Sequence, residues 1–167
     1  MPSRRVPTEL NVGTYYLTMT IQRWYYLFDR HNRWQILTDS LRYCQDNKGL
    51  ELNGYVFMLN HIHLIATSSD MAGFLRDFKR FTSVKFKQNI EATEPNVLQL
   101  FVDEEGKYRF WMETNAPKKI ENMDFYRQKL NYIHENPVRK GYVAKPEYWF
   151  WSSANPASPI QVRFFTG

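Results

Sequence analysis

Cysteine is almost absent from the chain, which contains a single one, Cys44. One thiol cannot form an intrachain disulfide, so a disulfide framework is excluded, as is a zinc site built from several cysteines. Cys44 falls in a segment with the apolar spacing of a helix, where a buried and inert thiol is the simplest interpretation. A metal site in this protein would therefore use nitrogen and oxygen ligands.

Long hydrophobic runs are also absent. No stretch approaches the roughly 20 apolar residues needed to span a bilayer. The first residues, Met1 to Arg5, are followed by no apolar run of signal-peptide length. We therefore expect no membrane partner and a cytoplasmic location.

What the chain does contain is a basic, aromatic-rich sequence of one-domain length. Its 167 residues, 43% of them hydrophobic, suit one domain with a single core, and residues 1–167 show no repeat or linker that would mark a second. The 22 Lys and Arg exceed the 17 Asp and Glu, and the resulting formal charge of +5 favours a polyanionic partner. Aromatic residues make up 17% of the chain. Most should be core, but unpaired bases also stack on such rings.

The residue pattern predicts an α+β fold. Segments rich in β-branched and aromatic residues predict strands at 12–21, 55–59, 61–67 and 107–112, the second and third forming a hairpin. Apolar residues at helical spacing predict helices at 33–47, 71–89 and 125–135. This order indicates an antiparallel sheet with helices packed on one face.

Two histidines lie two residues apart on the predicted strand 61–67. Alternate side chains of a strand share a face, so His61 and His63 would lie together while the apolar residues between them face the core. Neutral imidazole is a common metal ligand. Two ligands do not complete a metal shell, however, and histidines held by structural hydrogen bonds are the alternative.

Tyr132 and Asn136 are separated by one helical turn, so the phenol and the amide oxygen would project from the same helix face. Asn136 could complete the metal shell through its side-chain oxygen. Such a mixed set suits Mn²⁺ or Mg²⁺ better than a closed zinc site. Asn136 could also cap a new helical turn that starts at Pro137 and ends at Gly141. The two interpretations are compatible, since a break after Asn136 could aim the amide inward.

A divalent cation beside Tyr132 would change the chemistry open to it. A tyrosine hydroxyl is protonated at neutral pH and is a poor nucleophile unassisted, but a cation can polarise a scissile phosphate next to it. The product would be a phosphotyrosine linkage that keeps the phosphodiester energy, so rejoining needs no ATP. Consistent with this, the 7 glycines are scattered and form no phosphate-binding loop. In the alternative, Tyr132 is a half-buried packing residue.

The predicted helix 71–89 carries several basic residues and follows the histidine strand closely. We predict that they form a groove for phosphates leading to the metal, with a solvated helix face as the alternative. These residues are Arg76, Lys79, Arg80, Lys85 and Lys87.

The ordered set of motifs resembles the single-tyrosine HUH transposases, and among them the REP-associated tyrosine transposases. The similarity rests on residues 55–65, 110–113 and 130–141, with shorter matches at 13–16 and 151–154. It implies a ferredoxin-like antiparallel sheet, His61 and His63 as the metal-binding pair, Asn136 as third ligand and Tyr132 as nucleophile.

The resemblance also implies a substrate. This is single-stranded DNA, often beside an imperfect hairpin, cleaved to leave a 5′-phosphotyrosine and a free 3′-hydroxyl. The resemblance assigns the recognition of bases beside the hairpin to Gly13, Thr14, Tyr15 and Tyr16. Tyr15 replaces the tryptophan that is common in the family at this position. A smaller ring can still stack on a base.

Three classes of function follow from the sequence. The resemblance favours an active DNA strand transferase, with a replication initiator or relaxase-like HUH nuclease as the nearest enzymatic alternative. A non-catalytic module that binds single-stranded nucleic acid and a plain structural domain are the other two. The REP-associated group is generally monomeric, so a monomer is expected and a dimer left open.

Overall fold

The computed structural model describes residues 12–113 and 117–167. Within them, the strands are β1 (Gly13–Thr20), β2 (Glu51–Phe57), β3 (His61–Ser68) and β4 (Lys118–Lys119). The helices are α1 (Arg33–Asn47), α2 (Met71–Thr93), α3 (Met123–His134) and α4 (Asn136–Arg139), with 3-10 segments η2 (Gln22–Trp24), η3 (Pro95–Phe101) and η4 (Pro146–Tyr148). None of the described helices is long and apolar enough to cross a membrane.

The sheet is antiparallel, with strand order β2-β3-β1-β4. β1 and β3 pair along their full length, from Gly13 opposite Ser68 to Thr20 opposite His61. β2 and β3 form the predicted hairpin, with an irregularity in register between Leu52 and Gly54. The predicted α+β class and antiparallel sheet are therefore confirmed.

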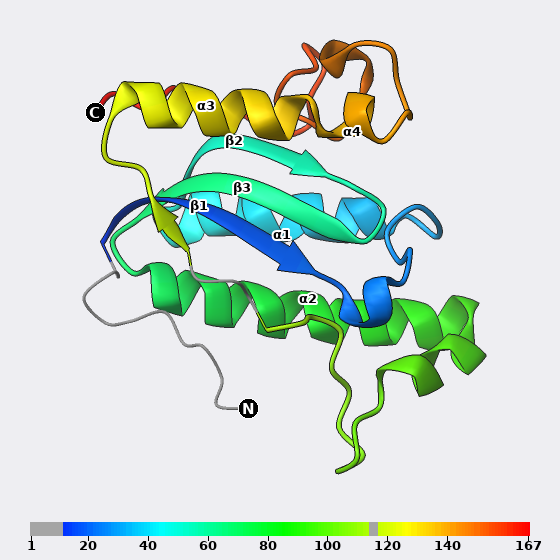
Figure 1. Cartoon of the computed structure of the whole chain (residues 1–167). Helices are drawn as coiled ribbons and strands as arrows, with labels where there is room; N and C mark the ends of the chain where they lie inside the picture. The colour runs from blue at the N-terminus through cyan, green and yellow to red at the C-terminus, as the bar shows by residue number, and fades with distance from the viewer. Residues whose placement is uncertain (1–11, 114–116) are drawn as a thin grey trace.

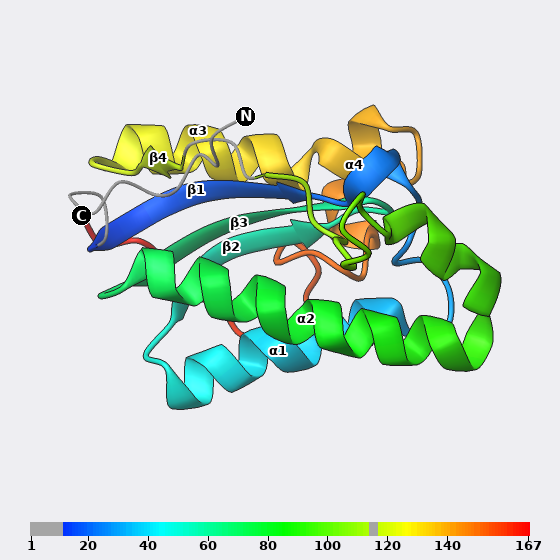
Figure 2. The same cartoon turned by 90° about the horizontal axis from the view of Figure 1, so that it is seen from below.

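Helices lie on both faces of the sheet, whereas the sequence led us to expect them on one (Figures 1 and 2). α1 and α2 pack side by side against one face, and α3 crosses the other face over β2 and β3. The reason lies in the central strand, because the successive residues Leu64 and Ile65 of β3 are both fully buried. A strand with two apolar faces needs a covering layer on each side.

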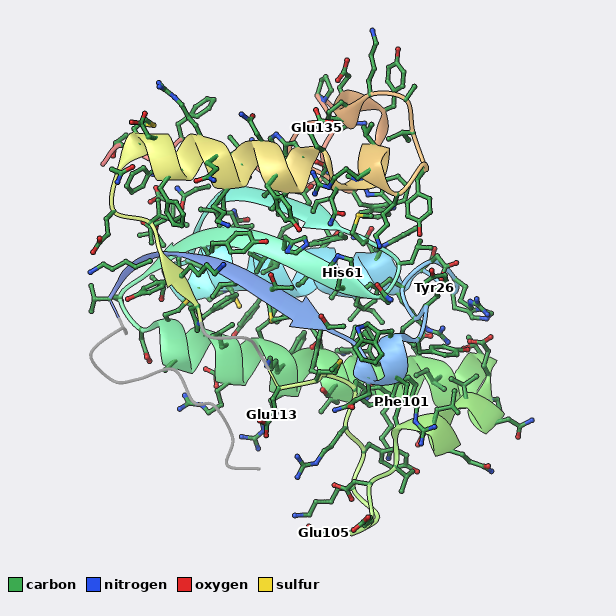
Figure 3. The ribbon with its side chains drawn as sticks, viewed as in Figure 1. Tyr26, His61, Phe101, Glu105, Glu113 and Glu135 are labelled. Carbon is green, nitrogen blue, oxygen red and sulfur yellow. The ribbon has the colours of Figure 1, made fainter. Side chains whose placement is uncertain are left out.

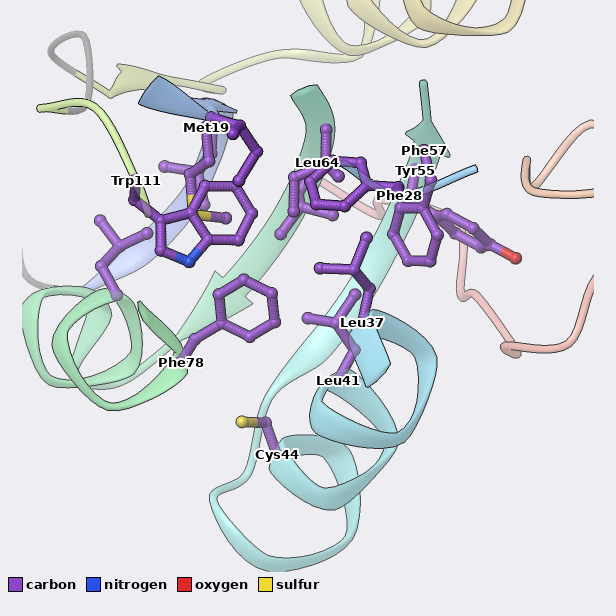
Figure 4. Close-up of a cluster of buried hydrophobic side chains, with 14 of the residues drawn as sticks. Met19, Phe28, Leu37, Leu41, Cys44, Tyr55, Phe57, Leu64, Phe78 and Trp111 are labelled. Carbon is purple, nitrogen blue, oxygen red and sulfur yellow. The ribbon is translucent and has the colours of Figure 1, made fainter. Parts of the chain in front are cut away.

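The larger core lies between the sheet and the helices α1 and α2 (Figure 4). Side chains of alternate strand residues meet the apolar stripes of the two helices, as expected for faces with periods of two and 3.6 residues. They include Met19, Leu64, Leu37, Leu41, Phe78 and Trp111. Cys44 belongs to this core and burial raises its pKa to about 11, which confirms the prediction of an inert thiol.

The smaller core lies between α3 and the opposite face of the sheet. It brings Tyr16, Val56 and Ile65 from the strands against Tyr126 and Ile133 of α3. The hydroxyl of Tyr126 donates a hydrogen bond to the carbonyl of Asn53 at 2.6 Å. These contacts hold α3 in place above the end of β3 that carries the two histidines.

The prediction of a strand at residues 107–112 is wrong, because the segment forms no regular strand. The segment makes only isolated bridges, Val102 with Tyr108 and Ile21 with Trp111, and the fourth strand forms instead at Lys118–Lys119. Phe110 and Trp111 are both buried. Because two successive bulky side chains enter the core, the segment cannot keep the alternation of a strand.

Candidate functional site

The two histidines lie together at the start of β3, as the alternation predicted. His63 pairs with Thr18 of β1 and His61 with Thr20. Their ring centroids are 4.8 Å apart and the ring planes are nearly perpendicular, at 82°. Both rings lie on the face of the sheet that α3 covers, since the intervening Ile62 belongs to the larger core on the other face.

Hydrogen bonds to the Nδ1 atoms orient both rings. His61 Nδ1 lies 2.8 Å from Asn60 Oδ1, and because an amide oxygen only accepts, Nδ1 carries the proton and Nε2 is the ring nitrogen with a lone pair. His63 Nδ1 lies 2.9 Å from Thr18 Oγ1 and 3.1 Å from the Tyr16 hydroxyl. Partners of this kind are typical of histidines that bind a metal through Nε2.

Burial keeps both imidazoles neutral at physiological pH. It lowers the pKa of His61 to about 4, with a further contribution from the positive charge of Lys140. It lowers the pKa of His63 to about 3, assisted by the neighbouring His61, Arg139 and Lys129. Neutral imidazole is the form that binds metal ions.

Asn136 reaches the histidines from the helical layer above. Its side chain is buried, and its Nδ2 atom lies 3.3 Å from His61 Nε2. The alternative in which Asn136 caps the following turn is wrong, because Asn136 is the first residue of α4 and Glu135 precedes it as the cap. A half-turn of the amide group would turn its oxygen towards His61 Nε2 in place of the nitrogen.

Tyr132 lies beside the second histidine, near the end of α3. Its ring centroid is 6.0 Å from that of His63, and the side chain is 47% exposed. The guanidinium of Arg139 stacks 4.2 Å above the ring, and its Nη2 donates to the carbonyl of Tyr132 at 2.7 Å. The hydroxyl is thus on an accessible side chain held by a cation from the next helix.

The donor set is compatible with a divalent cation. No group of three His, Cys, Asp or Glu residues with the spacing of a metal site occurs among the described residues, so a protein-only shell of those types is not available there. Two neutral imidazoles and one amide remain, and substrate oxygens and water would fill the other positions. Such open nitrogen and oxygen sites suit Mn²⁺ or Mg²⁺.

The residues predicted to recognise bases lie in β1, and the two tyrosines face opposite layers. The ring of Tyr15 is fully buried in the larger core, so it cannot stack on a base in this structure. Tyr16 faces the histidines through its hydroxyl. Thr14 Oγ1 and Thr67 Oγ1 form a hydrogen bond of 2.6 Å. Gly13 begins the strand with a φ of +131°.

The predicted groove on α2 does not lead to the histidines. α2 packs under the larger core, on the face of the sheet away from α3 and Tyr132 (Figure 1). Two of its cations are engaged locally, Arg76 with Asp77 and Lys87 with Glu91. Burial lowers the pKa of Lys79 to about 8, while Arg80 and Lys85 are exposed. The helix follows β3 in sequence, but the connection carries it to the opposite layer.

Basic residues that the sequence reading missed surround the site instead. Lys129 lies 5.7 Å from the Tyr132 ring and 4.9 Å from that of Tyr16. Arg139 is the last residue of α4, and Lys140 follows it. Helical spacing could have identified Lys129, which precedes Tyr132 by three residues and so shares its face.

Comparisons with known proteins agree with this fold. The sequence matches no protein-family model, and no curated protein matches it significantly. Among solved structures, the chain is similar to one described as a REP-associated tyrosine transposase bound to a REP hairpin. The match has a TM-score of 0.64 and 23% identity, and covers 86% of this chain and 77% of that one. The protein therefore shares the α+β fold of that transposase.

Proposed function

We propose that this protein is a metal-dependent endonuclease and strand transferase for single-stranded DNA, with Tyr132 as the nucleophile. One observation carries the proposal: Tyr132 and Asn136, from one helical layer, converge on His61 and His63 of the sheet, with the Tyr132 ring centroid 6.0 Å from that of His63. The fold shared with a tyrosine transposase supports the same class of reaction.

His61, His63 and Asn136 would hold the cation, Mg²⁺ or Mn²⁺. Two neutral histidines, one of them with its proton on Nδ1, and a buried amide suit that role. A cation bound there supplies a Lewis acid for the scissile phosphate and for the charge on the departing oxygen.

Tyr132 makes and later releases the covalent bond. Its hydroxyl oxygen attacks the phosphorus, the bond from phosphorus to the 3′ oxygen breaks, and that oxygen leaves as a 3′-hydroxyl after taking a proton. The tyrosine proton passes to water, which reaches the side chain because it is 47% exposed. The phosphate stays on the 5′ side, and attack by a 3′-hydroxyl in the reverse direction rejoins the strand.

The substrate we propose is single-stranded DNA beside an imperfect hairpin, bound by a monomer. The solved structure with the shared fold is bound to a REP hairpin. The cations around Tyr132, which include Lys129 and Arg139, would contact phosphates of the strand entering the site.

Incubating the protein with a labelled hairpin oligonucleotide and Mn²⁺ tests the proposal. We expect an adduct that survives denaturation, since only a covalent bond does, and we expect EDTA to prevent it. Tyr132→Phe keeps the ring and its contacts but removes the attacking oxygen, so the adduct should fall below detection. The measurement is the fraction of label that migrates with protein in a denaturing gel.

Tyr148→Phe is the matched control, because Tyr148 is also an exposed tyrosine, at 59%. Its adduct should equal that of the unchanged protein. Tyr126, the nearest alternative nucleophile along α3, is buried with its hydroxyl on a carbonyl. An adduct retained by Tyr132→Phe would contradict the assignment of the nucleophile. Binding without any adduct would favour a non-catalytic module.

A further inference from the structure

A turn rich in aromatic residues lies directly beside His61. It follows β1 and begins with η2, and its side chains Trp24 and Tyr26 are 65% and 50% exposed. Figure 3 shows Tyr26 and His61 at the same end of the sheet, below Glu135. An exposed ring has a face that is free to stack on a base.

One amide joins this turn to the histidine. Asn60 Nδ2 donates to the carbonyl of Trp24 at 3.0 Å, while Asn60 Oδ1 accepts from His61 Nδ1 at 2.8 Å. A movement of the turn would therefore reach His61 through a single side chain. On its other side, the turn lies near Tyr142, which follows α4, because burial and the neighbouring Tyr26 raise the pKa of Tyr142. The turn is thus linked to the two elements that carry the proposed ligands.

The backbone of the turn is held in an uncommon conformation. Arg23 and Trp24 have φ values of +61° and +51°, in the left-handed region that non-glycine residues seldom adopt. Strain of this kind persists where the surroundings impose it, and it gathers at functional sites. Its effect here is to turn the Trp24 side chain out into solvent.

The turn lines an open cavity of about 510 Å³. Rings and cations contribute most of its wall, which consists of Arg23, Trp24, Tyr25, Tyr26, Arg30 and Asn60. Arg30 is partly neutralised by Asp29 and Glu94. Arg23 is exposed and makes no ion pair with any described residue, so its guanidinium is available to an anion.

We propose that this cavity binds an unpaired nucleotide of the DNA strand, with its base stacked on Trp24 and its phosphate on Arg23. Stacking needs an exposed ring face and phosphate binding needs a cation beside it, and both occur here within successive residues. The inference rests on the proposed function, since it assigns the subsite next to the reacting phosphate. An unpaired base is required because a paired base has no free face to offer.

The test measures binding in a Tyr132→Phe background, so that no chemistry interferes. A fluorescent hairpin oligonucleotide with a single-stranded flank is titrated and its anisotropy followed. Stacking on one ring predicts that Trp24→Ala weakens binding by about 5- to 150-fold, and that Trp24→Phe recovers most of the loss. Tyr43→Ala is the matched control, because Tyr43 is a 53% exposed ring on α1, and it should leave affinity unchanged.

The position of the bound base is then located by removing bases from the flank one at a time. One abasic position should weaken binding as much as Trp24→Ala does, and combining the two should cost no more than either alone. Additive losses at every position, or an affinity that Trp24→Ala leaves unchanged, would overturn the inference.

The two proposals fail in different ways. Trp24 contributes to binding and not to bond breaking, so Trp24→Ala with Tyr132 intact should need a higher DNA concentration to form the adduct. Adduct formation together with indifference to Trp24→Ala would refute the subsite alone. No binding of any single-stranded DNA would refute both the subsite and the proposed function.

Discussion

Three histidines are held neutral by burial, and this makes the fold sensitive to acid. Burial lowers the pKa of His61 to about 4, of His63 to about 3 and of His134 to about 4, from 6.5. Below pH 6.5 the unfolded chain therefore binds more protons than the folded one. Their contribution to stability is complete above that pH and is lost as pH falls towards 4, by up to about 1.4 kcal/mol per pH unit for each histidine. We expect the urea midpoint of metal-free protein to fall from pH 7 to pH 4.5.

His134→Gln isolates one of these histidines. Its amide can keep the hydrogen bond that His134 Nε2 makes to Ser153 at 2.7 Å, and its midpoint should fall less steeply with acid. His31→Asn is the control, since His31 is exposed and its φ of +55° suits asparagine. Carboxylates titrate alike in His134→Gln and the unchanged protein, so that comparison cancels them, whereas His31→Asn also removes an imidazole 3.7 Å from Glu94. Equal slopes for His134→Gln and the unchanged protein would contradict a buried neutral imidazole.

The alternation of side chains along a strand predicted which residues of the candidate site share a face of the sheet. Alternation along 61–67 was enough to place His61 and His63 together, because it needs only the period of a strand. The same rule puts Tyr15 on the apolar face of β1 and Tyr16 on the face that carries its threonines. The resemblance nevertheless assigned both tyrosines to base recognition, and the structure buries Tyr15 in the larger core.

At the scale of elements, the position of α3 depends on a glycine in the strand below it. A Cβ at Gly54 would lie 2.5 Å from Leu130 Cδ1 and 3.4 Å from Ile133 Cδ1. Gly54→Ala should therefore push the Leu130 side chain away from the sheet and disturb the packing of α3 on β2, at a cost of about 1–3 kcal/mol. Because α3 carries Tyr132, DNA adduct formation should fall as well. Urea unfolding measures the first effect and the denaturing gel the second.

Leu130→Ala provides the compensating change. It removes the atom in closest conflict, so the double variant Gly54→Ala/Leu130→Ala should lose less stability than the sum of the single variants. Strictly additive losses would mean that the two residues are not in contact. The approach of α3 to β2 could not have been predicted, because a glycine in a strand indicates close contact without naming the partner.

The basic helix α2 is another element for which the sequence predicted the extent but not the position. Its extent was predicted well, since Met71–Thr93 carries apolar residues at helical spacing. Its layer was not, because proximity in sequence to β3 does not determine which side of the sheet a connection crosses. The aromatic residues Phe74, Phe78 and Phe86 bind it to the larger core, and that contact takes its cations away from Tyr132.

For the whole molecule, the proposed function raises the question of which face would bind the DNA strand. Lys129 and Lys140 lie on the face with Tyr132, whereas Arg76 and Arg80 lie on α2 under the opposite face. Two double charge reversals separate the faces, Lys129→Glu/Lys140→Glu and Arg76→Glu/Arg80→Glu. Each substitution of Lys or Arg by Glu lowers the formal charge by two, so the formal charge of both double variants falls from +5 to +1. Net charge is thus matched, and only the location differs.

We expect the first pair to weaken binding of single-stranded DNA and the second to leave it nearly unchanged. Each lost phosphate contact should also reduce the slope of log affinity against log salt by about 0.7, hence by about 1.4 for the Lys129 and Lys140 pair. Anisotropy titrations at several salt concentrations measure both quantities. Equal losses would mean that overall charge attracts the strand without a defined face. A greater loss from the α2 pair would move the phosphate path to the opposite layer, away from the histidines and Tyr132, and would leave the proposed chemistry without a bound substrate.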